Sequence, residues 1–328
     1  MVLDPNELYD LHEPAGLGVA ISAADPADLA AEGPAGRARR RPVLIVGLTG
    51  FVDAGNASRL ACEHLLAISG PERQQVVASF DLDQLLDYRS RRPVMVFVED
   101  HWDSYDEPRL RLTRLTDAAG TPFLLLAGPE PDLQWERFCA AVRNLIARLG
   151  VGLTVGLNSI PMAVPHTRPI GVTAHASRRE LIAGHESWLQ QVRVPGSAAN
   201  LLEYQLGRDG RDAMGFAVHV PHYLAQTDYP EAAETLLDSI ARATGLRLPA
   251  DALRSAAADV RVQVDEQVAQ SDEVAAVVRA LEQQYDAFLR GRQGNDLLGT
   301  EVGRLPSAEE LGAELERFLA EQADRDDQ

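Results

Sequence analysis

The stretch Val164-Pro165-His166-Thr167-Arg168-Pro169 stops an apolar, strand-like run, and Val220-Pro221-His222-Tyr223 stops a second run with the same Val-Pro-His unit. Proline has no backbone N–H to donate, so it ends a buried strand or lies at the edge of a sheet. Each histidine therefore follows the exit of a strand, where ligands of open α/β sheets bind. The two units form either a ligand site or a paired structural device. We expect both on the same edge of one sheet.

Strand-like and helix-like patterns alternate around these units. Val43-Leu44-Ile45-Val46 is a continuous apolar run, which is typical of a strand buried on both faces. Residues 133–149 carry one apolar stripe at helical spacing. Further strands are expected at residues 76–77, 94–98, 123–126, 151–157, 170–173, 192–194 and 216–220, and further helices at 57–68, 110–119, 198–206 and 230–244. The alternation predicts an α/β fold with a mixed, mainly parallel sheet covered by helices on both faces.

Changes in the sequence pattern along the chain divide it into three regions. Residues 1–41 read as an N-terminal arm, and residues 42–248 as the α/β core domain. In residues 249–328 strand formers vanish and apolar residues recur at helical spacing, which predicts a C-terminal helical extension. Within it we expect helices around 253–264 and 274–288, a glycine-containing loop over 291–303, and a last helix opened by a capping box at 307–310.

Composition excludes several classes of function. The 328 residues carry a net charge of −18, which disfavours nucleic acid and anionic membrane surfaces as partners. All 31 basic residues are arginine, so no lysine can form a Schiff base or bind a nucleotide phosphate as in a Walker A motif. Cys62 and Cys139 lie in helix-like runs without a nearby partner, which favours buried, free thiols in a reducing cytoplasm. We see no signal peptide and expect no membrane-spanning helix.

The first candidate site is the glycine-rich turn Gly47–Asn56, between the first core strand and a helix. Its backbone N–H groups could bind an anion at the helix N-terminus. Alternatively, Asp53 or Asn56 caps the helix and the glycines supply unusual backbone angles. The turn matches neither a dinucleotide fingerprint nor a Walker motif, so we assign it no cofactor.

The second candidate site comprises the polar residues at the strand exits. Arg168 could hold a carboxylate or phosphate while His166 moves a proton, with His222 and Tyr223 at the neighbouring exit. Alternatively, Arg168 pairs with an acid and the histidines bind backbone carbonyls. His219 and His222 have metal-ligand spacing, but positions i and i+3 of a strand point to opposite faces, so no metal site is predicted. No residue is assigned a catalytic role.

An acidic segment, Glu99-Asp100-His101-Trp102-Asp103, follows one expected strand. It could raise the basicity of His101 or bind a cation. We interpret it as a solvated loop.

Several short motifs, taken in this order, resemble the proteasome assembly chaperone 2 family, in particular its actinobacterial branch. They are Gly47–Asn56 (GLTGFVDAGN), Asp81–Pro93 (DLDQLLDYRSRRP), Gly128–Asp132 (GPEPD), Val164–Pro169 (VPHTRP), Val194–Ser197 (VPGS), Val220–Tyr223 (VPHY) and Leu281–Asp286 (LEQQYD). The resemblance covers roughly residues 5 to 320.

The resemblance implies a phosphorylase/hydrolase-like α/β fold, self-association with a trimer as one candidate arrangement, and a role in assembling proteasome α-subunits without ATP. It carries no agreed catalytic residues. Some archaeal relatives end in a hydrophobic-Tyr-X tail that docks into the proteasome ring, whereas this sequence ends Arg325-Asp326-Asp327-Gln328. Burying such charges is unfavourable, so we do not expect docking through this tail.

The leading hypothesis is a non-enzymatic, cytoplasmic assembly factor or scaffold that self-associates, with proteasome α-subunits as a candidate partner. The alternative is a small-molecule enzyme of the nucleoside phosphorylase or hydrolase type that uses His166, Arg168 and His222. A third hypothesis is an oligomeric scaffold whose C-terminal helices bind a client.

Overall fold

Strand β2 (Val43–Thr49) lies near the centre of an eight-stranded sheet because its side chains are apolar on both faces. The computed structural model describes residues 3–12, 41–50, 52–185 and 191–298. The sheet has the order β1-β3-β6-β7-β2-β8-β10-β9. The other strands are β1 (Tyr9–Leu11), β3 (Gln75–Phe80), β6 (Arg111–Thr116), β7 (Pro122–Pro129), β8 (Leu153–Met162), β9 (Val172–Ala176) and β10 (Ala213–Pro221).

The middle of this sheet is parallel and its outer strands are antiparallel. β7, β2, β8 and β10 pair in parallel, whereas β6, β3 and β1 on one side and β9 on the other join in antiparallel fashion. The predicted mixed sheet with a parallel core is therefore confirmed.

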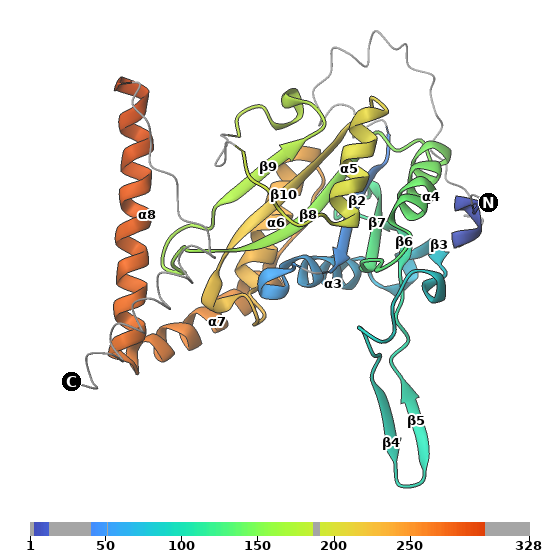
Figure 1. Cartoon of the computed structure of the whole chain (residues 1–328), viewed down its shortest axis with the longest axis horizontal. Helices are drawn as coiled ribbons and strands as arrows, with labels where there is room; N and C mark the ends of the chain where they lie inside the picture. Colours follow the sequence, from blue (N-terminus) through green and yellow to red (C-terminus); the bar gives the residue numbers. More distant parts are fainter. Residues whose placement is uncertain (1–2, 13–40, 51, 186–190, 299–328) are drawn as a thin grey trace.

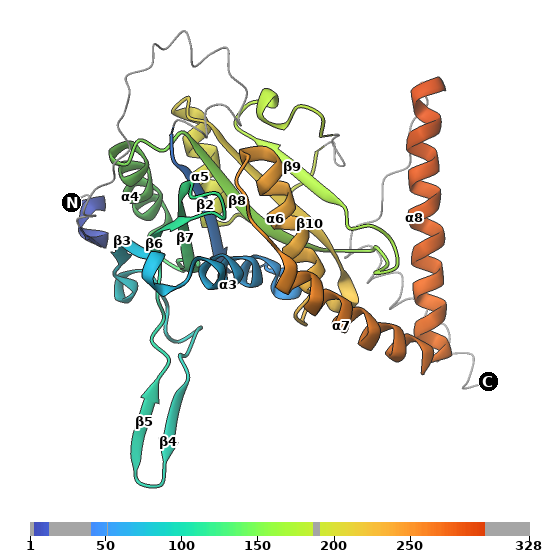
Figure 2. The same ribbon diagram turned by 180° about the vertical axis from the view of Figure 1, so that it is seen from behind.

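Helices cover both faces of the sheet (Figures 1 and 2). Val43 and Ile45 of β2 belong to the core shared with α3 (Ala57–Ser69), α6 (Pro230–Thr244) and α7 (Asp251–Ala269). Leu44 and Val46 point the opposite way, into the core shared with α4 (Trp135–Arg148) and α5 (Ala198–Arg208). This alternation within one strand is why the sheet has to be covered twice.

Two elements extend away from this layered body (Figures 1 and 2). Helix α8 (Asp272–Leu298) stands at the end near β9, and together with α7 it forms the expected C-terminal helical extension. A two-stranded hairpin, β4 (Met95–Val98) with β5 (His101–Tyr105), projects from the other end. No helix within the described ranges is long and apolar enough to cross a membrane.

Three expectations from the sequence are wrong in the core region. Residues 110–119, expected as a helix, contain β6. Leu112 and Leu115 are buried in different cores, because a three-residue spacing places side chains on opposite faces of a strand. Residues 94–98 do form a strand, but in the separate hairpin, and residues 99–103 form its turn and the start of β5 rather than a loop. Residues 192–194 form no strand.

The chain ends of the described region also differ from expectation. Residues 5–11, expected in an arm, form a 3-10 turn (Pro5–Leu8) and β1, which pairs with β3 at the sheet edge. Helix α8 continues through residues 291–298, where a loop was expected. The helix expected after residue 307 lies outside the described residues. The division into three regions stays a prediction.

Replacing Asp117 by Ala should destabilise the fold. This carboxylate is 4% exposed, and it accepts hydrogen bonds from the backbone N–H groups of Ala119 (2.9 Å), Thr121 (2.7 Å) and Arg247 (2.8 Å). Removing it leaves three donors without their acceptor, which should lower the free energy of unfolding by about 2 kcal/mol. Urea unfolding measures the change. Asp238→Ala on the exposed side of α6 is the control, and equal stability of the two variants would contradict the assignment.

Candidate functional site

The two Val-Pro-His units lie on the same edge of the sheet, as expected. β8 and β10 run in parallel, and Pro221 lies opposite Met162, the last residue of β8. The loop 164–169 and the turn 222–224 therefore leave the sheet side by side. We call this edge, at the carboxyl ends of β2, β8 and β10, the rim.

His166 lies at the centre of a hydrogen-bond network on the rim. It is 4% exposed. The Tyr223 hydroxyl accepts the backbone N–H of His166 (2.8 Å) and lies 2.6 Å from Nδ1, while Nε2 lies 3.1 Å from Oδ1 of Asp265 on α7. The Tyr223 hydroxyl, which accepts the backbone N–H, can also donate its own proton to Nδ1. In that tautomer Nε2 carries the ring proton and donates it to Asp265.

Burial raises the pKa of Tyr223 to about 12, so this phenol stays protonated at neutral pH and remains a donor to His166. Both ring nitrogens of His166 thus have protein partners. The ring is held between the rim and α7.

Arg168 turns away from His166 and binds α8. Its Nε and Nη2 donate to the two carboxylate oxygens of Asp286, each at 2.8 Å, and Nη1 donates to Glu282 at 3.2 Å. The hydrogen bonds that Arg168 donates to Asp286 lower the pKa of Asp286 and raise the pKa of Arg168. Glu282 and Asp286 are four residues apart, so both lie on the same face of α8.

Two more hydrogen bonds join the same loop to α8. The Thr167 hydroxyl donates to Glu282, and the Tyr285 hydroxyl donates to the backbone oxygen of Pro169 at 3.1 Å. The loop 164–169 therefore binds α7 through His166 and α8 through its next three residues. We call this set of contacts the latch.

Asp53 acts locally, at the start of α3. Its carboxylate accepts the backbone N–H groups of Ser58 (2.8 Å) and Arg59 (3.1 Å), and the Ser159 hydroxyl of β8 (2.9 Å). The donors that would bind an anion are thus engaged by a side chain of the turn itself. Asn56 has a left-handed backbone and donates to Asp228 at 2.6 Å. Of the two interpretations of this turn, an anion site and a helix cap, the geometry is that of a helix cap.

His222 and His219 have different environments. His222 is exposed, and its ring packs edge-on against Tyr223 with the centroids 5.4 Å apart. His219 is 1% exposed and lies 2.8 Å from the Thr173 hydroxyl, and burial lowers its pKa to about 4. Within the described ranges, no three His, Cys, Asp or Glu side chains gather as metal ligands.

The sequence analysis missed the acidic partners of the rim. Asp265, Glu282 and Asp286 complete the latch, yet nothing in their spacing reveals that they face residues about 100 positions earlier. Glu130 was also missed: it is 6% exposed, and its carboxylate accepts the backbone N–H of Ala198 (2.6 Å) at the start of α5. Most of these residues lie in motifs that the sequence analysis had quoted, namely VPHTRP, LEQQYD, GPEPD and VPGS, but the sequence did not show which motif contacts which.

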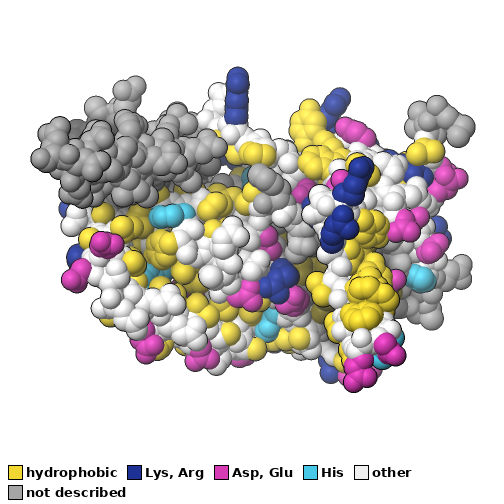
Figure 3. Space-filling model, turned by 60° about the horizontal axis from the view of Figure 1, so that its bottom comes forward, with side chains coloured by type: hydrophobic (Ala, Val, Ile, Leu, Met, Phe, Trp, Pro, Cys, Tyr) yellow, Lys and Arg dark blue, Asp and Glu magenta, His cyan; other side chains and the backbone are white. Residues whose placement is uncertain are grey.

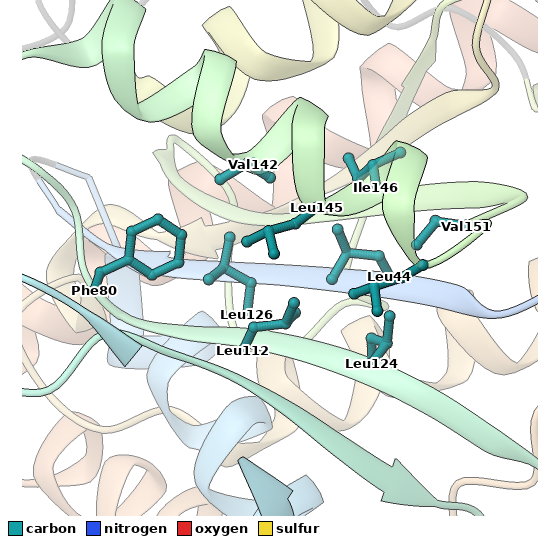
Figure 4. A pocket seen from close by; sticks show the side chains of 10 residues that line it. Leu44, Phe80, Leu112, Leu124, Leu126, Val142, Leu145, Ile146 and Val151 are labelled. Atoms are coloured by element: carbon teal, nitrogen blue, oxygen red, sulfur yellow. The ribbon is translucent and has the colours of Figure 1, made fainter. Parts of the chain in front are cut away.

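A small apolar cavity lies away from the rim, between α4 and the sheet (Figure 4). It is lined by ten hydrophobic side chains, among them Leu44, Phe80 and Ile146, and has a volume of about 10 Å³. It offers no polar group to bind or transform a ligand, and a water molecule there would find no partner. We interpret it as a packing gap.

Breaking the latch should release α8. In Arg168→Ala, Asp286 and Glu282 lose their ion-pair partner, so α8 should be cleaved faster in limited proteolysis than in the wild type, with cleavage inside residues 272–298. Arg279→Ala, an exposed position on the same helix, is the control. Equal cleavage rates in the wild type and both variants would contradict the latch.

Acidification should have a related effect. The folded-state pKa of Asp286 lies below its ordinary, unfolded-state value of about 4. Its ion pair with Arg168 therefore stabilises the protein fully above the unfolded-state pKa, and this stabilisation is lost as the pH falls through the lower, folded-state pKa. Hydrogen exchange of α8 should therefore accelerate more steeply between pH 5 and 3, after correction for the intrinsic rate, in the wild type than in Asp286→Asn. Parallel pH profiles would refute this expectation.

The comparisons with known proteins agree with these motifs. The chain matches the PAC2 family over residues 47–268. It is similar to Rv2714, a Mycobacterium tuberculosis protein of unknown function, with 50% identity and a TM-score of 0.78 over 88% of this chain and 92% of that one. A Corynebacterium glutamicum protein of unknown function is 41% identical, with a TM-score of 0.75 over 86% of this chain and 98% of that one.

A third solved structure is the Mycobacterium tuberculosis proteasome-assembly chaperone homologue Rv2125. It is 25% identical, with a TM-score of 0.64 over 72% of this chain and 99% of that one. A comparison with curated proteins gave no match. The family match spans more than half of the chain, and these three relatives are actinobacterial. The chain therefore belongs to the PAC2 family, as its motifs implied.

Proposed function

We propose that this protein is a non-enzymatic assembly factor that acts through protein–protein contacts and self-association, with proteasome α-subunits as its client. The observation that carries the proposal is the latch. The residues with the most obvious catalytic potential, His166 and Arg168, bind Tyr223, Asp265, Glu282 and Asp286 of the same chain. Their role is then to hold two helices on the rim.

Similarity to Rv2125 supports the choice of client, because that protein is a proteasome-assembly chaperone homologue. A chaperone of this kind needs a rigid surface rather than a reaction site. The latch supplies rigidity, since a bidentate arginine–carboxylate pair fixes orientation as well as distance. The absence of lysine from the sequence fits an assembly step that does not use ATP through a Walker motif.

A small-molecule enzyme remains the second candidate, and one observation favours it. Tyr223 contacts both histidines of the rim: its ring centroid lies 5.8 Å from that of His166 and 5.4 Å from that of the exposed His222. Such a chain of groups could pass a proton to solvent. However, Arg168 binds Asp286 and Glu282 instead of joining these groups, so it does not supply the anion-binding role that this candidate needs. Fold similarity alone does not imply an activity.

Native mass spectrometry with α-subunits from the same cell tests the leading proposal. We expect a complex of defined stoichiometry at micromolar concentrations. An unrelated protein of similar negative charge is the control, because a net charge of −18 can cause weak non-specific association. Absence of a complex, with or without β-subunits, would contradict the proposed client.

The enzyme candidate has a separate test. A screen with nucleosides and phosphate should give no turnover. Turnover that disappears in His166→Ala and in His222→Ala would instead establish the second candidate.

A further inference from the structure

Residues 4–12, which we call the N-terminal segment, lie against the edge of the sheet in the manner of a bound peptide. Strand β1 is three residues long, and within the described part of the chain it pairs with β3 alone. The segment lies at the end of the molecule where the N-terminus is marked (Figures 1 and 2). Acidic side chains are visible at this end, on the right of Figure 3. Only residues 13–40 connect the segment covalently to the rest of the chain.

Backbone hydrogen bonds fix the direction of the segment without reading its sequence. β1 runs antiparallel to β3. At one end of this pairing the backbone N–H of Asp81 donates to Leu8 at 2.9 Å. At the other end the N–H of His12 donates to Val77 at 2.8 Å. A peptide that adds a strand to the edge of a sheet is bound in the same way, through main-chain hydrogen bonds.

One side chain anchors the segment in the core. Leu8 is 0% exposed and belongs to the same apolar core as Phe80 and Phe138. Tyr9, which follows it, packs its ring on Phe80 with the centroids 5.7 Å apart. Leu3, just before the segment, is 47% exposed by contrast. The side-chain recognition therefore depends on a leucine followed by an aromatic residue.

Arg137 of α4 binds the beginning of the segment through its backbone. Its Nε and Nη2 both donate to the carbonyl oxygen of Asp4, at 2.9 and 2.7 Å. Its Nη1 donates to the side-chain oxygens of Gln84 (2.8 Å) and Gln134 (3.0 Å), which belong to the body of the protein. Two glutamines thus hold the guanidinium in the orientation that the segment requires, and they do so independently of the segment.

Gln134 has a backbone conformation that is costly for a residue of its type. Its φ is 58°, in the left-handed region, directly before the first residue of α4. Such residues gather at binding sites, where the surrounding contacts hold them in place. Here the Gln134 amide group donates to the backbone oxygen of Gln84 at 2.6 Å and accepts from Arg137. This arrangement indicates a preformed site, because an edge strand by itself does not require it.

Charge also distinguishes this site in a chain whose net charge is −18. The Arg137 guanidinium lies 3.6 Å from the Glu7 carboxylate. Burial raises the pKa of Tyr9, and the positive charge of Arg148, on the same helix as Arg137, opposes this rise. Two arginines of α4 therefore act on the segment, which itself carries acids and no arginine. The site is matched to an acidic peptide.

We propose that the edge of β3 and the beginning of α4 form a peptide-binding site that the N-terminal segment fills as an internal competitor. The occupant that displaces it is an extended, acidic segment of a partner protein with a leucine followed by an aromatic residue. One buried side chain and a short ladder hold the N-terminal segment, so it can be exchanged. Tethering gives it an effective concentration on the order of millimolar, against which a partner must compete. The inference goes beyond the proposed function, since it does not depend on which protein is the client.

The test uses the full chain with a site for a specific protease inserted after residue 25. The probe is a fluorescently labelled synthetic peptide of residues 1–12, and its anisotropy is measured with the uncut chain and with the cut chain after gel filtration. We expect the probe to bind the cut chain, and to bind the uncut chain about tenfold more weakly or worse, because the tethered segment competes with it. Circular dichroism should show that the cut chain keeps its fold.

Matched substitutions separate the site from non-specific binding. A Leu8→Ala probe should bind the cut chain about tenfold more weakly or worse, because it lacks the buried anchor. A Leu3→Ala probe, altered at the exposed leucine, should bind like the original. In the protein, Arg137→Ala should weaken binding of the probe, whereas Arg208→Ala, at an exposed position on α5, should not.

Three outcomes would overturn the inference. If the cut chain never releases its segment or unfolds on losing it, the segment is a permanent strand of the fold. If the Leu8→Ala and Leu3→Ala probes bind equally, the probe does not use the site. If uncut chains associate through their segments, so that Leu8→Ala in the protein abolishes the association, the occupant is a second copy and not a partner protein. None of these results bears on α-subunit binding, which the mass spectrometry above measures separately.

Discussion

The latch between loop 164–169 and the last two helices is the contact on which the shape of this protein depends. Helix α7 contributes Leu253 and Val264 to one core of the layered body, whereas α8 stands beside the sheet rather than on it (Figure 1). The bidentate pair of Arg168 with Asp286, and the chain from Tyr223 through His166 to Asp265, tie these helices to the rim. The latch thus fixes where α8 stands relative to the rim.

The other motifs shared with the family also meet in pairs. Gly55 of the glycine-rich turn donates its N–H to Ala225 and accepts that of Tyr229, both at 2.9 Å, which joins the turn to the chain after VPHY. Gly55 has φ of +65°, and a Cβ there would lie 2.8 Å from Tyr229, so glycine is required. Glu130 of GPEPD binds the start of α5 just after VPGS. These residues are distant in sequence and close in space, as expected of a structural framework.

The sequence predicted those parts of the fold that depend on a local pattern. The apolar stripe of α4, and Pro230 at the first turn of α6, gave helices close to their observed bounds. The helix predicted over residues 110–119 was wrong, because leucines three residues apart fit one face of a helix or the two faces of a strand. Only the pairing of this segment with β3 and β7 decides that it is the strand β6. The strand expected at residues 94–98 exists, but its pairing with β5 could not be predicted, because an apolar run does not reveal which strand pairs with it.

The sequence identified the candidate site residues by their chemical type, but their roles could be assigned only once their hydrogen-bond partners in the structure were known. Arg168 had both an anion-binding and an ion-pairing interpretation, and the choice depends on Asp286, 118 residues later. The most direct measurement of the latch is a double-mutant cycle of Arg168→Ala and Asp286→Ala, read by hydrogen exchange along α8. The account predicts that the double variant exchanges no faster than Arg168→Ala alone, because Arg168→Ala already removes the contact with Asp286. Additive effects of the two changes would contradict it.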